Sequence, residues 1–139
     1  MVAPVDPEID RRCAEATLGL LVAAVNDGDD ARLSQLMGTS IWGSLSISGP
    51  TLWKPEEAVA ALLELNRSGE RWTLMRLDFN GRGWDGGVHF GLVVRRAGPD
   101  LPPPYVESTG KGVLDCPEGR LRILGIGSAL APRGTERPG

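Results

Sequence analysis

Three side chains that could transfer protons lie in the second half of the chain. They are Asp78, His89 and Asp115, and His89 is the only histidine of the protein. A carboxylate or an imidazole can act as a general acid or base when it reaches a bound substrate and its environment tunes its pKa. Whether any of the three can do so depends on the side of the sheet to which it points.

Four runs of alternating apolar and polar residues predict the strands that carry these side chains. The runs are Arg71–Phe79, Val88–Arg96, Val106–Cys116 and Arg120–Gly127. A glycine-rich connection over residues 80–87 and a tight turn over residues 117–119 predict an antiparallel meander. Gly110 and Gly112 interrupt the third run, which indicates strong curvature, a bulge or a close approach of a neighbouring backbone.

The alternation also assigns side chains to the two faces of this sheet. Burial of apolar area is the largest driving force available, so the more apolar face should pack on the helices. That face carries Met75, Leu77, Phe79, Val88, Phe90, Leu92, Val94, Leu114 and Cys116. By the same parity Asp78, His89 and Asp115 point away from the helices, unless a bulge turns Asp115 inward. They are therefore candidates for catalysis, and none of them is assigned a catalytic role.

Three helices and a short strand are predicted before the meander. Asp6 and Pro7 form a good helix start, and the first helix should run to about Asn26, where Gly28 ends it. The next elements are a helix over Ala31–Met37, a strand over Ile41–Ile47 and a helix from Pro55 to about Arg67 or Ser68. The order α-α-β-α-β-β-β-β predicts an α+β fold with helices packed on one face of a curved antiparallel sheet.

Length and composition limit the classes of protein. The 139 residues suit a single domain over residues 6–128, with flexible ends at residues 1–5 and 132–139. The net charge is −3 and the basic residues are scattered, which disfavours nucleic-acid binding. No apolar run approaches membrane-spanning length, and the amino terminus lacks the regions of a signal peptide. We therefore expect a cytoplasmic protein, and the preference for Arg over Lys suggests a GC-rich bacterial genome.

The two cysteines, Cys13 and Cys116, have two readings. The simpler is a pair of free thiols buried as small hydrophobic groups. A disulfide requires Cα atoms within about 7 Å, which the sequence cannot show. Two cysteines and one histidine match no common zinc spacing, so we predict no metal site and no cofactor.

Tryptophans are candidates for lining a pocket, because a large ring with one polar N–H often contacts ligands. Trp42 and Trp53 lie around the short strand and the entry to the third helix, where core or interface packing would explain them equally well. The predicted ligand pocket consists of Trp42, Trp53, Met75, Leu77, Phe90, Leu92 and Leu114. Trp84, which lies in the glycine-rich hairpin loop, is expected to be an exposed contact residue.

The chain resembles the nuclear-transport-factor-2-like superfamily and, within it, the small bacterial SnoaL-like domains. The resemblance covers roughly residues 6–128 and rests on the order of elements and on these segments: Asn26–Asp30, Leu33 and Leu36, Gly110–Cys116 and Gly119–Ile123. It implies a cone-shaped α+β barrel, an apolar pocket between helices and concave sheet, and homodimers through the convex face. Members include polyketide cyclases, a ketosteroid isomerase, dehydratases, an epoxide hydrolase and non-enzymatic binding domains, so the fold selects no single activity.

Three functions remain open at this point. The first is a domain that binds a small apolar molecule and acts as a homodimer. The second is a SnoaL-like cyclase, isomerase or hydrolase that uses Asp115, His89 or Asp78 in the cone pocket. The third is an interaction module whose helices fill the cone and leave no pocket. An apolar pocket above about 300 Å³ would favour the first, and an ionisable group inside such a pocket would favour the second.

Overall fold

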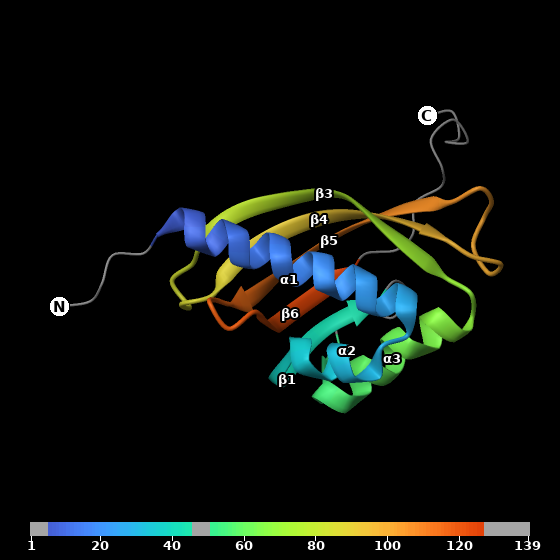
Figure 1. Ribbon diagram of the computed structural model, residues 1–139, viewed down its shortest axis with the longest axis horizontal. Helices are drawn as coiled ribbons and strands as arrows, with labels where there is room; N and C mark the ends of the chain where they lie inside the picture. Colours follow the sequence, from blue (N-terminus) through green and yellow to red (C-terminus); the bar gives the residue numbers. More distant parts are fainter. Residues whose placement is uncertain (1–5, 46–50, 127–139) are drawn as a thin grey trace.

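Three helices pack against one face of a strongly curved sheet (Figure 1). The structure is a computed structural model that describes residues 6–45 and 51–126, and their side chains except those of residues 39–45 and 51–53. The elements are α1 (Pro7–Asp27), α2 (Asp30–Leu36), β1 (Met37–Leu45), β2 (Thr51–Trp53), α3 (Pro55–Arg67), β3 (Arg71–Arg82), β4 (Val88–Ala97), β5 (Val106–Asp115) and β6 (Arg120–Ile126). The predicted α+β class is confirmed. The predicted flexible ends at residues 1–5 and 132–139 lie outside the described residues.

The sheet has the strand order β2-β1-β6-β5-β4-β3. Strands β3 to β6 form the predicted antiparallel meander. The prediction of a wholly antiparallel sheet is wrong, because β1 lies parallel to β6. Alternation within a strand does not reveal its partner, and these two strands lie far apart in the sequence. The three-residue strand β2 pairs antiparallel with β1 and is too short to give an alternation signal.

The region between α1 and β1 differs slightly from the prediction. The carboxylate of Asp29 accepts a hydrogen bond from the Arg32 N–H at 3.0 Å, which caps α2 as Asp6 caps α1. Helix α2 ends at Leu36, and β1 begins directly with Met37 instead of at Ile41. The predicted end of this strand, Ile47, lies outside the described residues.

Polar side chains attach the C-terminal end of α1 to its neighbours. The Asn26 side chain donates to the Trp72 carbonyl at 2.8 Å and accepts from the Trp72 N–H at 2.7 Å, so it pairs with β3 as a strand would. The Asn66 side chain on α3 donates to the carbonyls of Val25 and Asn26, both at 2.9 Å. The Asn66 side chain thus bonds to carbonyls of the last turn of α1, where intrahelical donors run out.

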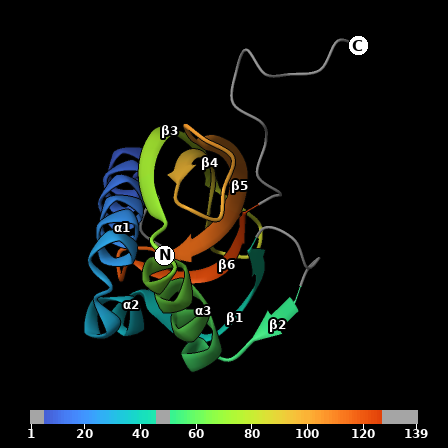
Figure 2. The same ribbon diagram turned by 90° about the vertical axis from the view of Figure 1, so that its right-hand side faces the viewer.

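Helix α1 lies against the concave side of the sheet, as the end-on view shows (Figure 2), and the apolar core packs between them. Burial alternates along β4 as predicted, and Phe90 and Leu92 are only 1% and 3% exposed. They belong to one apolar cluster with Leu18 and Leu21 of α1. Each side chain of this size contributes about 1.5–3 kcal/mol when it is buried completely. The face assignment for β4 is therefore confirmed.

A bulge on β3 corrects the face assignment of that strand. The pairing with β4 shifts between Leu74 and Arg76, so Met75 is the extra residue. Trp72 and Leu74 consequently pack on the core together with Leu77, whereas 43% of Met75 is exposed. The prediction that Met75 belongs to the helix-facing side is wrong because strict alternation does not continue through a bulge.

The glycines inside β5 mark a close approach of backbones. A Cβ on Gly112 would lie 2.1 Å from the Ile123 carbonyl oxygen, and one on Gly110 would lie 2.5 Å from that of Gly125. The pairing of β4 with β5 continues without a shift at either glycine. The close-approach reading is confirmed, and neither glycine turns Asp115 towards the core.

Candidate functional site

A hollow of about 320 Å³ lies beside the β3–β4 hairpin on the side of the sheet away from the helices. His89, Val113 and Ile123 are cross-strand neighbours on β4, β5 and β6, and they alternate with residues of the core. This parity places them on the outer face of the sheet. The lining residues are Asn80, His89, Phe90, Lys111, Gly112, Val113 and Ile123.

The hairpin loop over residues 83–87 folds onto this outer face. The Gly83 N–H donates to the Gly87 carbonyl at 2.8 Å, and the Gly86 N–H donates to the Gly83 carbonyl at 3.1 Å. A Cβ on Gly83 would lie 2.4 Å from His89 Nε2, and one on Gly87 would lie 2.2 Å from Val113 Cγ1. Glycine is therefore needed at both positions for the loop to lie against the sheet.

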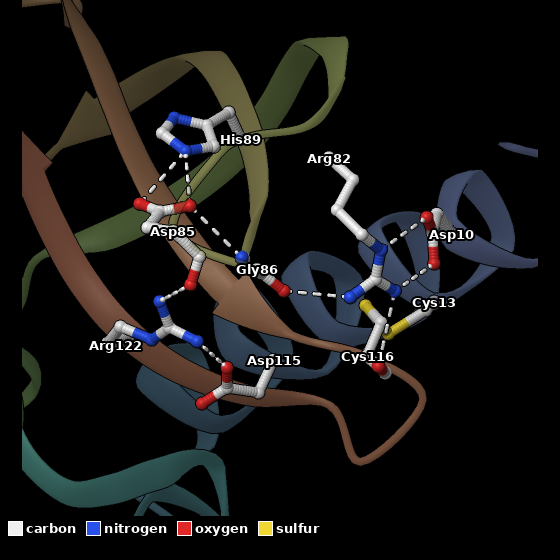
Figure 3. A network of polar contacts seen from close by, with 10 residues as sticks. Asp10, Cys13, Arg82, Asp85, Gly86, His89, Asp115, Cys116 and Arg122 are labelled. Atoms are coloured by element: carbon white, nitrogen blue, oxygen red, sulfur yellow. Dashed lines mark hydrogen bonds and ion pairs between the residues drawn. A yellow bond between two sulfur atoms is a disulfide. The ribbon is translucent and has the colours of Figure 1, made fainter. Parts of the chain in front are cut away.

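The loop brings a carboxylate to the histidine of the hollow (Figure 3). His89 Nε2 lies 3.1 and 3.2 Å from the two carboxylate oxygens of Asp85. The Gly87 N–H also donates to Asp85, and this bond together with the contact to His89 lowers the pKa of Asp85 below its ordinary value. Asp85 is thus ionised at neutral pH. The other ring nitrogen of His89, Nδ1, lies on the side of the ring away from Asp85 (Figure 3).

Arg122 on β6 links the loop to Asp115. One guanidinium nitrogen donates to the Asp85 carbonyl at 3.1 Å, and another forms an ion pair with the Asp115 carboxylate. Asp115 therefore points away from the core, as predicted. It lines a different hollow of about 310 Å³ together with Gly38, Glu118 and Arg120.

Arg82 holds the loop from the other side of the hairpin. It donates to the Gly86 carbonyl at 2.7 Å, to the Cys116 carbonyl at 3.3 Å and to both carboxylate oxygens of Asp10. The hydrogen bond to Asp10 raises the pKa of Arg82 above its ordinary value. The loop that presents Asp85 is thus bound by two arginines, one on β3 and one on β6 (Figure 3).

Cys13 and Cys116 form a disulfide with a Cα–Cα distance of 6.1 Å. It joins α1 to the end of β5, so the reading of two free thiols is wrong. A signal was present in the sequence, because parity places Cys116 on the helix-facing side of the sheet. The sequence pattern did not show that Cys13 lies opposite Cys116.

A separate buried polar network lies where β3 begins and β4 ends. The Glu70 carboxylate accepts from Arg96 at 2.7 and 3.1 Å and from the Trp72 indole N–H at 2.5 Å. Arg96 also donates to the Ser108 hydroxyl at 3.3 Å. Glu70 and Arg96 are 5% and 4% exposed, and their opposite charges and hydrogen bonds compensate for burial. This pair could not be predicted from the sequence, because Glu70, which directly precedes β3, and Arg96, on β4, lie 26 positions apart.

The catalytic candidates lie on the outer face, and the hollow contains one of them. His89 lines the hollow, whereas Asp78 is bound to Arg76 at 3.0 Å and Asp115 to Arg122. Asp85, which sequence reasoning did not single out, is the carboxylate that reaches His89. Its position in a Gly-Trp-Asp-Gly-Gly loop four residues before the only histidine was the available signal.

The residues predicted to line a cone pocket have different surroundings. Phe90, Leu92 and Leu114 are buried in the core, and Leu77 packs at its edge. Met75 is exposed, and the side chains of Trp42 and Trp53 lie outside the described part of the chain. The cone pocket stays a prediction. Among the described residues, no cluster of three or more His, Cys, Asp or Glu is placed to bind a metal ion. None of the described helices has the combination of length and apolar character that a membrane-spanning helix needs.

Comparison with known proteins identifies the fold. No family model and no curated protein matches the sequence. A candidate polyketide cyclase from Sinorhizobium meliloti has 12% identity and a TM-score of 0.64, over 80% of this chain and 93% of that one. The protein Rd1NTF2_05 has 15% identity and a TM-score of 0.60, over 82% and 96%. An LEH-like epoxide hydrolase from M. tuberculosis has 14% identity and a TM-score of 0.55, over 84% and 82%.

These similarities define the architecture of the chain. It has the nuclear-transport-factor-2-like fold, in which a curved sheet wraps around helices, as the sequence resemblance predicted. Identities of 12–15% are too low to transfer an activity, so the function has to be argued from the residues of this chain.

Proposed function

We propose that the protein binds a small apolar molecule with one polar or anionic head, in the outer-face hollow that contains His89. The volume of this hollow and the types of residue that line it together support the proposal. At about 320 Å³, the hollow reaches the size range of small-molecule sites. Ligand sites of this kind combine apolar walls with a few convergent polar groups.

The residues that line the hollow supply both apolar walls and polar groups. Val113, Ile123 and Phe90 supply apolar side chains at the hollow. Asn80, His89 and Lys111 supply an amide, an imidazole and an ammonium group at the same hollow. An anionic head would gain a charge-assisted hydrogen bond from Lys111, while the body of the ligand would cover the apolar wall. Similarity to structures named as a candidate polyketide cyclase and an epoxide hydrolase is in keeping with a small organic ligand.

Isothermal titration with octanoate and with 1-octanol tests the proposal. We expect both probes to bind the native protein, and octanoate to bind more tightly. Lys111→Met should weaken octanoate at least tenfold and leave 1-octanol nearly unchanged, because it removes the charge and retains an apolar stem. Each bound probe should also raise the melting temperature when its concentration exceeds the Kd.

Two tryptophan substitutions locate the site. Ile123→Trp places a large ring in the hollow and should abolish binding of both probes. Val93→Trp adds the same ring at a half-buried position of β4 that does not line the hollow, so it serves as the matched control. Absence of binding to the native protein, or equal loss in both variants, would contradict the proposal.

Homodimerisation through the sheet is a second proposal, supported by exposed apolar groups at this face. Trp84 in the hairpin loop is 97% exposed, and Ile123 is half-buried on the outer face. Exposed tryptophans of this kind often anchor protein interfaces. Light scattering should give the mass of a dimer for the native protein and a lower mass for Trp84→Ser. A monomer mass for the native protein at micromolar concentration would exclude the dimer there.

A further inference from the structure

The first two turns of α1 have few apolar contacts with the rest of the molecule. Of residues 7–13, all of which the structure describes, only Asp10 is buried, and Ile9 is 55% exposed. The Arg11 guanidinium lies 5.0 Å from the centre of the Phe79 ring, a contact that is weak at an exposed site. Hydrophobic stabilisation scales with the apolar area removed from water, so little of it holds this segment on the sheet.

A covalent bond and an ion pair attach the segment instead. Cys13 is bonded to Cys116, which directly follows β5. Asp10 forms hydrogen bonds through both carboxylate oxygens with Arg82 at the end of β3. Asp10 and Cys13 are three positions apart, so one face of α1 makes both links.

Arg82 connects this attachment to the hairpin loop over residues 83–87. Its guanidinium donates to Asp10 of α1, to the Cys116 carbonyl at 3.3 Å and to the Gly86 carbonyl at 2.7 Å (Figure 3). The disulfide holds Asp10 close to Arg82 and so raises the effective concentration of the carboxylate there. Without the S–S bond, the ion pair alone would have to keep α1 and the loop on the same guanidinium.

One partner of the disulfide is open to attack from solution. Cys13 is only partly buried, whereas Cys116 is 7% exposed. Exchange between a thiol and a disulfide requires a thiolate to reach one of the two sulfur atoms. We therefore expect attack at Cys13, the more exposed partner.

We propose that the Cys13–Cys116 disulfide is a reversible redox switch that holds the first two turns of α1 and, through Arg82, the hairpin loop. The co-reactant is a dithiol. Its thiolate attacks Cys13 Sγ, the S–S bond of the protein breaks, and Cys116 leaves as a thiolate that takes up a proton. The second thiol of the reductant then displaces Cys13 as a thiol. Two electrons and two protons pass to the protein, the dithiol becomes a disulfide, and an oxidising disulfide reverses the step.

Hydrogen exchange of the oxidised and the dithiothreitol-reduced protein tests this switch. The amides of residues 11–16 bond to carbonyls of residues 7–12 in the helix, so reduction should speed their exchange about tenfold by local opening. The N–H groups of Gly83 and Gly86, which form hydrogen bonds within the loop, should exchange about threefold faster. The amides of residues 18–27, where α1 packs on the core, should keep their protection. Oxidised glutathione should restore the original pattern.

Two variants separate the switch from its connection to the loop. Cys13→Ala/Cys116→Ala lacks the bond, so it should exchange like the reduced native protein and show no response to the reductant. In Arg82→Met, reduction should still speed exchange in α1 but no longer at Gly83 and Gly86. A response of both glycines equal to that of the native protein would overturn the route through Arg82.

Two results would overturn the switch itself. Equal exchange of residues 11–16 in the oxidised and reduced protein would show that α1 stays in place without the disulfide. Loss of protection at residues 18–27 as well would show that the bond serves the whole fold rather than one segment. Both results come from the native sequence, so they stand even if Arg82→Met does not fold. They also do not depend on whether the hollow binds a ligand.

Discussion

Arg82 on β3 and Asp10 on α1 form a two-point ion pair, with Arg82 Nη2 2.7 Å from Asp10 Oδ1 and Nε 3.2 Å from Oδ2. The residues are 72 positions apart, and their side chains are 27% and 5% exposed. The two partners are therefore not equivalent. Arg82 can reach water if Asp10 is removed, whereas the Asp10 carboxylate remains buried if Arg82 is removed.

This asymmetry predicts the effect of single substitutions. Arg82→Met leaves a buried carboxylate without its counter-charge and should lower the free energy of unfolding by about 3 kcal/mol. Asp10→Asn retains an oxygen that accepts from Arg82, so it should cost less than half as much. Urea unfolding followed by tryptophan fluorescence measures both values. Arg76→Met at the exposed Arg76–Asp78 pair is the control and should hardly change the midpoint. A larger loss in Asp10→Asn than in Arg82→Met would contradict the argument.

The architecture could be predicted where local pattern determines it. Alternation along β4 and β5 predicted the buried faces, and Asp6, Pro7 and Gly28 predicted the bounds of α1 to within a residue or two. The pattern failed at Met75, because a bulge adds one residue and reverses the parity of Trp72 and Leu74. The sequence of one strand does not indicate where a bulge will occur in its pairing with another strand.

The site was only partly predictable, because local alternation does not show which distant segments come into contact. His89 was a candidate because it is the only histidine, and its outward direction followed from parity. Its partner Asp85 lies in a loop, where no period assigns a direction to a side chain. Arg122 and Arg82 reach that loop from β6 and β3, and such contacts depend on the tertiary arrangement rather than on spacing in the sequence.

The disulfide should contribute substantially to stability. Cys13 and Cys116 are 103 positions apart, and a cross-link that closes a loop of this length contributes up to about 4–5 kcal/mol in the chain-entropy treatment. The double variant Cys13→Ala/Cys116→Ala should melt at a lower temperature than the oxidised native protein. A strong reductant should lower the melting temperature of the native protein and leave that of the variant unchanged. Two alkylatable thiols in the folded native protein would contradict the bond.

Alkylation of cell extracts would also bear on location. Disulfides persist mainly in oxidising compartments and are rare in the cytosol. The cytoplasmic location stays a prediction, and recovery of the oxidised form from freshly trapped cells would count against it.

Acid should weaken the contact between Asp85 and His89. The pKa of Asp85 in the folded protein lies below its ordinary value of 3.8, so its ionised form stabilises the fold. This contribution is fully present above about pH 4 and is lost as the pH falls through the lower folded value. The melting temperature of the native protein should therefore exceed that of Asp85→Asn at neutral pH, and the difference should shrink below pH 4. A difference that stays constant down to pH 2 would show that ionisation of Asp85 has no part in stability.

Two glycines should respond to alanine in opposite directions. A Cβ on Gly87 would overlap Val113 Cγ1 at 2.2 Å and approach Arg122 Nη1 at 3.1 Å, so Gly87→Ala must lift the loop from the sheet. We expect a loss of about 1–3 kcal/mol, as for other overpacked sites, together with weaker binding of octanoate, because Val113 also lines the hollow. Gly19 lies inside α1 with no atom within 4 Å of a new Cβ, so Gly19→Ala should stabilise the protein by about 1 kcal/mol. Urea unfolding of the two variants measures both effects. If Gly87→Ala were as stable as the native protein and bound octanoate equally well, the loop would not depend on this contact with Val113.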